Sequence, residues 1–263
     1  MDLQIAGDTA LVSGSSRGLG KASATALAEK GVNVVINGRD EERLDDAVKE
    51  IGERASGEVV GHSGDPTDTD DIEALVDRTV DEFGGIDHLV TSIGGPKSGP
   101  FLETSDERWC RVFDTLVMSV VRLTRSAAPH LRADGGGTIV NVTSRTVKQP
   151  ADDMVLSNSV RMAVVGIEKT LSREFAPDVR VNTVLPGGHE MTRVEDLVQQ
   201  AADRGDVESF EDGMESREAE VPLEKLGDPM GFGRTVAYLC SEHAAYINGV
   251  ALSIDGRLID ATL

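Results

Sequence analysis

The stretch Ser13-Gly14-Ser15-Ser16-Arg17-Gly18-Leu19-Gly20 lies between an apolar run that begins at Thr9 and an alanine-rich segment that ends at Lys30. The run predicts a β-strand over residues 9–13, and the segment predicts a helix over residues 20–30. Gly14 permits a tight turn, Gly18 lets the backbone approach phosphate oxygens, and Gly20 opens a helix whose N-terminal N–H groups attract a pyrophosphate. The stretch therefore predicts a dinucleotide-binding strand–turn–helix unit.

The rest of the chain alternates short β-branched runs with longer helical patterns. We expect strands over residues 33–37, 59–63, 88–92, 138–143, 180–185 and 250–254, and helices over 41–51, 67–83, 105–131, 157–175 and 228–240. This alternation implies parallel pairing through right-handed crossovers. The predicted fold class is α/β: one domain over residues 1–263, a Rossmann-type doubly wound parallel sheet flanked by helices on both faces.

The segment over residues 187–222 breaks this alternation, because it is long, acidic and only partly helical in pattern. Loops of this length inside a compact domain usually close over a site or bind a ligand. We expect a lid or substrate loop inserted in the domain; the alternative is a surface excursion without a role.

Composition excludes several classes of protein. The formal net charge is −20, and a field of this sign repels nucleic acids and anionic membranes. Seven lysines accompany nineteen arginines and abundant carboxylates, which is typical of proteins from salt-loving organisms, where salt screens carboxylate repulsion. Cys110 and Cys240 form no metal-binding or disulfide pattern. The N-terminus lacks a signal-peptide pattern and no apolar run could span a membrane, so we expect a soluble cytoplasmic protein without a metal.

The end of the second expected strand indicates which dinucleotide binds. The sequence there is Ile36-Asn37-Gly38-Arg39, with no acidic residue to chelate ribose hydroxyls. Arg17 lies in the glycine loop, close to the same ribose. Two guanidinium groups suit a 2′-phosphate, since arginine pairs bidentately with phosphate. The pattern predicts NADP(H) as the cofactor.

Further motifs extend this interpretation along most of the chain. They are Asp65 within Ser63–Thr67, Gly94 after Thr91-Ser92-Ile93, the run over 138–144 (TIVNVTS), the run over 180–187 (RVNTVLPG) and the run over 246–256 (YINGVALSIDG). With the glycine loop, these motifs resemble the short-chain dehydrogenase/reductase family, and the β-ketoacyl-(acyl carrier protein) reductase-like branch in particular. The resemblance implies a set of cofactor-binding residues: Ser13, Gly14, Ser16, Arg17, Gly18, Leu19, Gly20, Arg39, Asp65, Gly94, Arg161, Pro186, Gly187 and Thr192.

The same resemblance implies an incomplete catalytic set. Ser144 matches the family's catalytic serine, but Ser157 stands at the position of the tyrosine and Arg161 at that of the lysine. Leu116 stands at the position of the asparagine. The two tyrosines, Tyr238 and Tyr246, have Glu242 and Val250 four residues later, so the chain has no Tyr-x-x-x-Lys pair.

The usual proton transfer cannot operate with these residues. A serine hydroxyl lacks the acidity of a phenol, and an arginine does not shuttle protons. Two replacement proton donors stay open: His189, whose imidazole titrates in the right range, and Ser144 acting through water. Arg161 could instead bind an anionic substrate group.

Three functions remain open from the sequence. The first is an atypical NADP(H)-dependent oxidoreductase acting on a carbonyl or alcohol, including a 3-oxoacyl thioester. The second is a catalytically inactive NADP(H)-binding sensor or subunit, and the third is a lyase or dehalogenase. The family habit and the apolar faces of the helices over 107–132 and 157–175 predict a homotetramer or homodimer.

Overall fold

The computed structural model of the chain describes residues 1–133, 135–190 and 192–261. In the helix that follows residue 191, the side chains of residues 192, 193, 196, 197 and 200 also lie outside the described part.

The described residues form one seven-stranded sheet in the order β3-β2-β1-β4-β5-β6-β7, and every neighbouring pair is parallel. The strands are β1 (Thr9–Val12), β2 (Asn33–Gly38), β3 (Val59–Ser63), β4 (His88–Ser92), β5 (Gly137–Val142), β6 (Val179–Pro186) and β7 (Ala251–Ile254). The order reverses between β1 and β4. In open parallel sheets, ligands bind at the carboxyl ends of the strands beside such a reversal.

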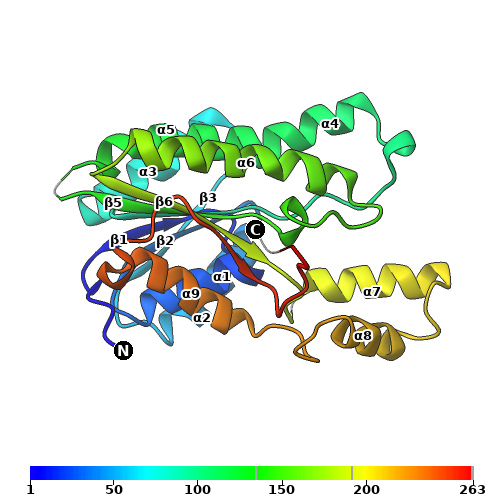
Figure 1. Ribbon diagram of the computed structural model, residues 1–263. Helices are drawn as coiled ribbons and strands as arrows, with labels where there is room; N and C mark the ends of the chain where they lie inside the picture. Colours follow the sequence, from blue (N-terminus) through cyan, green and yellow to red (C-terminus); the bar gives the residue numbers. More distant parts are fainter. Residues whose placement is uncertain (134, 191, 262–263) are drawn as a thin grey trace.

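Helices cover both faces of the sheet (Figure 1). One layer contains α1 (Gly18–Ala28), α2 (Glu41–Gly52) and α9 (Pro229–Cys240). The opposite layer contains α3 (Thr69–Phe83), α4 (Asp106–Phe113), α5 (Ser119–Leu131) and α6 (Val155–Glu174). This arrangement confirms the predicted fold class.

The predicted insertion contains two helices, α7 (Thr192–Arg204) and α8 (Phe210–Ala219), which lie beyond the sheet on the side where α4 also lies (Figure 1). They pack closely on each other, because a Cβ atom at Gly213 would stand 2.6 Å from Cγ1 of the buried Val198. Sequence patterns indicated only the first of these helices.

Successive residues of each strand face opposite helix layers, as the strand period of two requires. In β1, Val12 belongs to the hydrophobic cluster beneath α1 and α9, and Leu11 belongs to the cluster beneath α3 and α5. A third, smaller cluster lies among α4, α5 and α6 and includes Leu116 and Val160. Both faces of the sheet are therefore buried, which explains its nearly continuous apolar strands.

Two element boundaries differ from the prediction in an informative way. The helix expected over residues 105–131 is interrupted by a π-helical turn over Asp114–Met118, between α4 and α5. The helix expected from residue 67 begins at Thr69, because the Asp68 side chain accepts hydrogen bonds from the N–H groups of Asp70 and Asp71. No helix in the described part of the chain is long and apolar enough to cross a membrane.

Candidate cofactor and catalytic site

The glycine loop crosses the carboxyl end of β4, and this crossing requires glycine. Gly14 and Gly18 have φ values of 57° and 59°, which side chains disfavour. A Cβ atom at Gly14 would collide with the carbonyl oxygen of Ser92, and one at Gly20 would collide with the carbonyl of Gly14. Ser13 is buried here, and its Oγ accepts a hydrogen bond from the N–H of Ser92 at 3.2 Å. The loop is thus packed on the sheet edge at the point where the strand order reverses.

The start of α1 can receive an anion. Arg17 is its N-cap residue, its side chain is exposed and caps no N–H group, and Leu19 and Gly20 occupy the first turn. A Cβ atom at Gly18 would meet no atom within 4 Å. Free N–H groups and the positive end of the helix dipole attract phosphate. These residues fit the pyrophosphate of a dinucleotide.

Arg39 and Asp65 come together at the ends of β2 and β3. Nη1 of Arg39 lies 3.7 Å from Oδ2 of Asp65, and 75% of the Arg39 side chain is exposed. Although burial alone would raise it, hydrogen bonds from Thr67 and the charge of Arg39 hold the pKa of Asp65 below its ordinary value. Ser16 lies against Gly38, where a Cβ atom would stand 2.8 Å from the Ser16 Oγ. An accessible guanidinium therefore stands beside the glycine loop.

Sequence reasoning missed Asn37, at the tip of β2. Its Nδ2 donates to the carbonyl oxygens of His62 and Gly64 at 3.1 and 3.2 Å, and its Oδ1 accepts from the N–H of Gly14 at 3.5 Å. The side chain joins the glycine loop to the end of β3. The signal was present in the sequence, because Asn37 is a polar residue that ends an apolar strand.

Ser144 follows the end of β5 and is half-buried. Its Oγ accepts a hydrogen bond from the N–H of Thr146 at 3.2 Å, which caps a short 3₁₀ turn over Arg145–Val147. The hydroxyl retains its own proton for donation to another acceptor. Ser144 is therefore oriented by the turn at the edge of the sheet where ligands bind.

Ser157 lies close to Ser144 but is buried. Its Oγ is 3.2 Å from Oγ1 of Thr146, and only 2% of the residue is exposed. The Ser144–Thr146–Ser157 arrangement thus holds the start of α6 against the turn after β5. This geometry favours a structural role for Ser157 over proton donation.

Arg161 also faces the protein interior. Its Nη2 donates to the carbonyl oxygen of Ile93 at 3.0 Å, and its Nη1 reaches the carbonyl of Val142 at 3.4 Å. The residue is 6% exposed. The guanidinium joins the carboxyl ends of β4 and β5. We call these strand ends, Val142 and Ile93, the rim of the site, and Arg161 supports them from the protein interior. Gly94, which follows Ile93, is exposed, and an added Cβ atom would meet no described residue beyond its chain neighbours within 4 Å.

Leu116 is buried at the centre of the π-helical turn, within the cluster among α4, α5 and α6. Single π-helical turns inside α-helices are found frequently at functional sites. Here the turn is present, and the side chain at its centre is apolar and cannot anchor a water.

His189 follows Pro186-Gly187 but points into the core. Its ring contacts Phe232 edge-on, with centroids 5.4 Å apart, and its Nδ1 lies 3.3 Å from the Gly187 carbonyl oxygen. Burial lowers the pKa of His189, against the opposing effects of that carbonyl and of Asp228. The histidine fixes the start of the insertion to α9. The Thr192 side chain lies outside the described residues.

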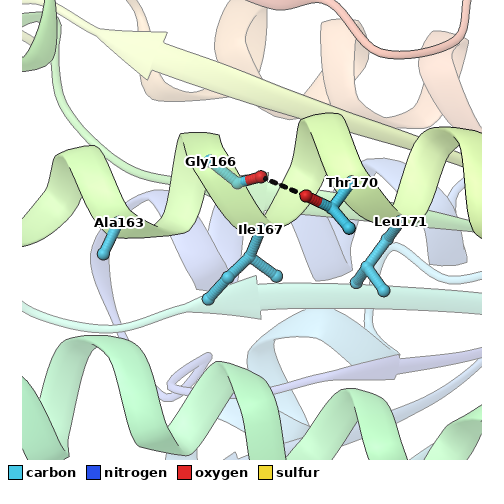
Figure 2. A pocket seen from close by; sticks show the side chains of 5 residues that line it. All are labelled: Ala163, Gly166, Ile167, Thr170 and Leu171. Carbon is cyan, nitrogen blue, oxygen red and sulfur yellow. Dashed lines mark hydrogen bonds between the residues drawn. The ribbon is translucent and has the colours of Figure 1, made fainter.

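A separate surface hollow lies along α6, where the drawn side chains point toward a neighbouring helix (Figure 2). Ala163, Gly166, Ile167, Thr170 and Leu171 line it, and the Thr170 hydroxyl donates to the Gly166 carbonyl oxygen at 3.0 Å. The lining is mainly apolar and offers no acid, base or nucleophile. Within the described residues, no group of three or more histidine, cysteine or acidic side chains could hold a metal ion.

Comparisons with known proteins agree with this geometry. A family model described as enoyl-(acyl carrier protein) reductase matches residues 14–257. The 3-oxoacyl-[acyl-carrier-protein] reductase FabG of Vibrio cholerae is 32% identical, over 97% of this chain and 99% of its own. The uncharacterized oxidoreductase YvrD of Bacillus subtilis is 30% identical, over 98% and 99%. An L-sorbose reductase from Gluconobacter frateurii, solved with NADPH and L-sorbose, superposes with a TM-score of 0.94 at 30% identity, over 99% of this chain and 100% of that one.

The sheet order, the glycine loop and the serine after β5 define a Rossmann-type dinucleotide-binding protein. The family match and the relatives place it further: the chain belongs to the short-chain dehydrogenase/reductase family.

Proposed function

We propose that this protein is an atypical NADP(H)-dependent oxidoreductase that acts on a carbonyl or alcohol, with 3-oxoacyl thioesters as the first substrates to test. The observation that carries the proposal is the exposed Arg39 guanidinium beside the glycine loop, at a strand tip that has no acidic residue of its own. A 2′-phosphate would replace the loose contact with Asp65 by a stronger arginine–phosphate pair. The relatives named as a 3-oxoacyl reductase and an NADPH-bound sorbose reductase support this substrate and cofactor class.

NADP(H), when bound, supplies or takes the hydride. The residues of this chain orient the reactants and handle the proton. The Ser144 hydroxyl can donate a hydrogen bond to a carbonyl oxygen, and water would supply the proton that this oxygen takes up on reduction to the alcohol. Burial of the His189 ring favours Ser144 and water over His189 as this route. Ser157 holds the start of α6 against the turn after β5, and Arg161 holds the ends of β4 and β5 in place next to the reactants.

Arg39→Ala tests the cofactor assignment. We expect NADPH to bind wild-type protein more tightly than NADH, and the variant to lose about 10- to 100-fold in NADPH affinity, since a hydrogen bond to a charged group contributes about 1.5–3 kcal/mol. NADH affinity should hardly change. Fluorescence titration measures both, with Arg54→Ala as the control, because Arg54 pairs with Glu29 elsewhere on the surface. Equal affinities of wild-type protein for NADPH and NADH would contradict the proposal.

A second candidate is a cofactor-loaded binding protein without turnover. It is favoured by the burial of Ser157 and Arg161, which leaves the half-buried Ser144 more accessible than either of them. The two candidates separate on NADPH consumption with a panel of 3-oxoacyl thioesters and ketoses. Consumption supports the enzyme, and tight NADPH binding without consumption supports the binding protein.

A homo-oligomer, a cytoplasmic location and a salt-loving source are further proposals, which rest on sequence pattern and composition.

A further inference from the structure

A row of polar side chains crosses the sheet beneath α5 and α6. Thr91 of β4 is the register partner of Asn141 of β5, which is the register partner of Thr183 of β6. The residues two positions earlier, Leu89, Ile139 and Val181, belong to the hydrophobic cluster on the α3 and α5 side. Because strand residues two apart share a face, the three polar side chains face the same helix layer.

The helices above this row contribute two polar residues, Thr124 of α5 and Glu168 of α6. Thr124 of α5 lies four residues after Val120, in the cluster among α4, α5 and α6, and three before Ala127, in the cluster beneath α3 and α5. Glu168 of α6 has the same spacing to Val164 and Leu171. These spacings indicate that Thr124 and Glu168 lie where the two hydrophobic clusters meet. Together with the row on the sheet, we call them the polar layer.

Contacts around Gly249 place the Glu168 carboxyl at β6. A Cβ atom on Gly249 would stand 3.6 Å from Oε1 of Glu168. The N–H of Gly249 donates to the carbonyl of Val181, and the N–H of Thr183 donates to the carbonyl of Val250. The carboxyl thus lies next to the Val181–Thr183 segment, where the polar row ends.

Several polar atoms of this layer are buried without a hydrogen-bond partner among the described residues. Glu168 and Thr183 are 0% exposed, Asn141 is 1% exposed and Thr124 is 4% exposed. Within the described residues, both carboxyl oxygens of Glu168, Nδ2 of Asn141 and the hydroxyl oxygens of Thr124 and Thr183 have no hydrogen-bond partner. The Asn141 oxygen is occupied, because it accepts from the Thr91 hydroxyl at 2.7 Å. Such groups are costly to bury unless something bonds to them.

We propose that this polar layer is a binding site for internal water, held by Glu168 together with Asn141, Thr183 and Thr124. Water can accept from the Asn141 amide and donate to the Glu168 oxygens, which is the combination these groups require. A cation would suit the carboxylate and hydroxyl oxygens, but the amide nitrogen only donates hydrogen bonds and would oppose it. Gaps of more than hydrogen-bond length between buried polar groups are commonly bridged in this way.

The raised pKa of Glu168 agrees with water as the ligand, because water can bond to the carboxyl in either protonation state. Burial raises its pKa to about 7, against the smaller opposing effect of Lys169. A neutral carboxyl both donates and accepts, so it can exchange hydrogen bonds with water in either direction.

The layer also bears on the candidate site through α6. Ser157, Arg161, Val164 and Glu168 follow one another at spacings of four, three and four residues, so they share the face turned to the sheet. Water bound at Glu168 would fix the same helix face that directs Arg161 to the ends of β4 and β5.

A high-resolution crystal structure of the full chain tests the proposal. We expect ordered water within hydrogen-bond distance of the Glu168 carboxyl and of Asn141 Nδ2 or Thr183 Oγ1. Direct bonds between these side chains without water would overturn the proposal. A metal ion refined at this position would overturn it as well.

Oxygen-17 magnetic relaxation dispersion, which counts long-lived internal waters, provides the test in solution. Glu168→Leu should lose at least one such water relative to wild-type protein. Thr170→Val is the matched control on the exposed side of α6 and should lose none. If the leucine variant fails to fold, Thr183→Val takes its place. An unchanged count in the folded polar-layer variant refutes the water site, whatever the outcome of the cofactor titrations.

Discussion

Arg161 bonds to the protein's own backbone, although its position in the sequence suggests contact with a ligand. Its guanidinium reaches the carbonyl oxygens of Ile93 and Val142, at the ends of two neighbouring strands. A buried carbonyl that loses its donor costs about 1–3 kcal/mol, so we expect Arg161→Met to lower the free energy of unfolding by about that amount for each carbonyl that water does not reach. Urea denaturation measures this change.

Arg173→Met is the control for that measurement, because Arg173 lies on the exposed side of the same helix. We expect the control to change stability by less than about 0.5 kcal/mol. NADPH affinity should also fall in Arg161→Met, since the rim at Ile93 loses its support. If the two variants were equally stable, the structural role of Arg161 would be refuted.

Motif spacing predicted which residues lie near the site, but it did not predict the interaction partners of their side chains. The glycine loop and Ser144 could be located from the sequence, because turn chemistry and strand ends have local signals. The direction of the Ser157 side chain depends on Thr146, which lies in the turn after β5. The direction of the His189 ring depends on Phe232, which lies on α9. A local sequence pattern contains no information about such a partner.

The helices illustrate the same limit at the scale of elements. The helical segment before β5 was predicted over residues 105–131 and begins one residue later, at Asp106, with Ser105 as its N-cap. The π-helical turn over Asp114–Met118 was not predicted, because it does not alter the apolar pattern. Helix starts were located more closely: Ser105 and Asp228, where two helices were expected to begin, each accept a hydrogen bond from an N–H group of the first turn. The helix expected from residue 67 is capped by Asp68 and begins at Thr69. Element order and sheet topology followed from the alternation of strands and helices, because parallel strands require crossovers.

The outer side of α4 and α6 carries apolar side chains that predict self-association. Phe113 is 46% exposed and Met162 is 52% exposed, and the hollow in Figure 2 lies on the same helix as Met162. A Phe113→Glu/Met162→Glu variant should shift the protein from dimer or tetramer to monomer in light scattering, because buried carboxylates oppose association. Leu223→Glu, at an exposed apolar residue outside these helices, should not. Wild-type protein that runs only as a 27.9 kDa monomer would contradict the prediction.

At the scale of the whole molecule, the dominant property is the net charge of −20 on 263 residues. Acidic side chains occupy the exposed faces of helices in both layers, for example Asp45 and Asp46 on α2 and Asp77 on α3. Charges of one sign spread in this way repel one another more strongly in the folded state than in the expanded chain. The hydrophobic clusters on both faces of the sheet must therefore stabilise the fold against a general repulsion.

Screening of that repulsion predicts stabilisation by salt. The Debye length falls from about 10 Å at 0.1 M to about 3 Å at 1 M, which removes most interactions between exposed charges on different elements. We expect Tm to rise by several degrees between 0.1 and 1 M NaCl, since about 1 kcal/mol corresponds to about 2–4 °C at this size. A variant with Asp45→Asn, Asp46→Asn and Asp77→Asn should begin with a higher Tm in 0.1 M salt and gain less from added salt. This second comparison separates screening from a general effect of NaCl on hydrophobic burial, which both proteins would share. A Tm that stays constant or falls with salt in the wild-type protein would contradict the prediction that charge repulsion measurably destabilises the fold.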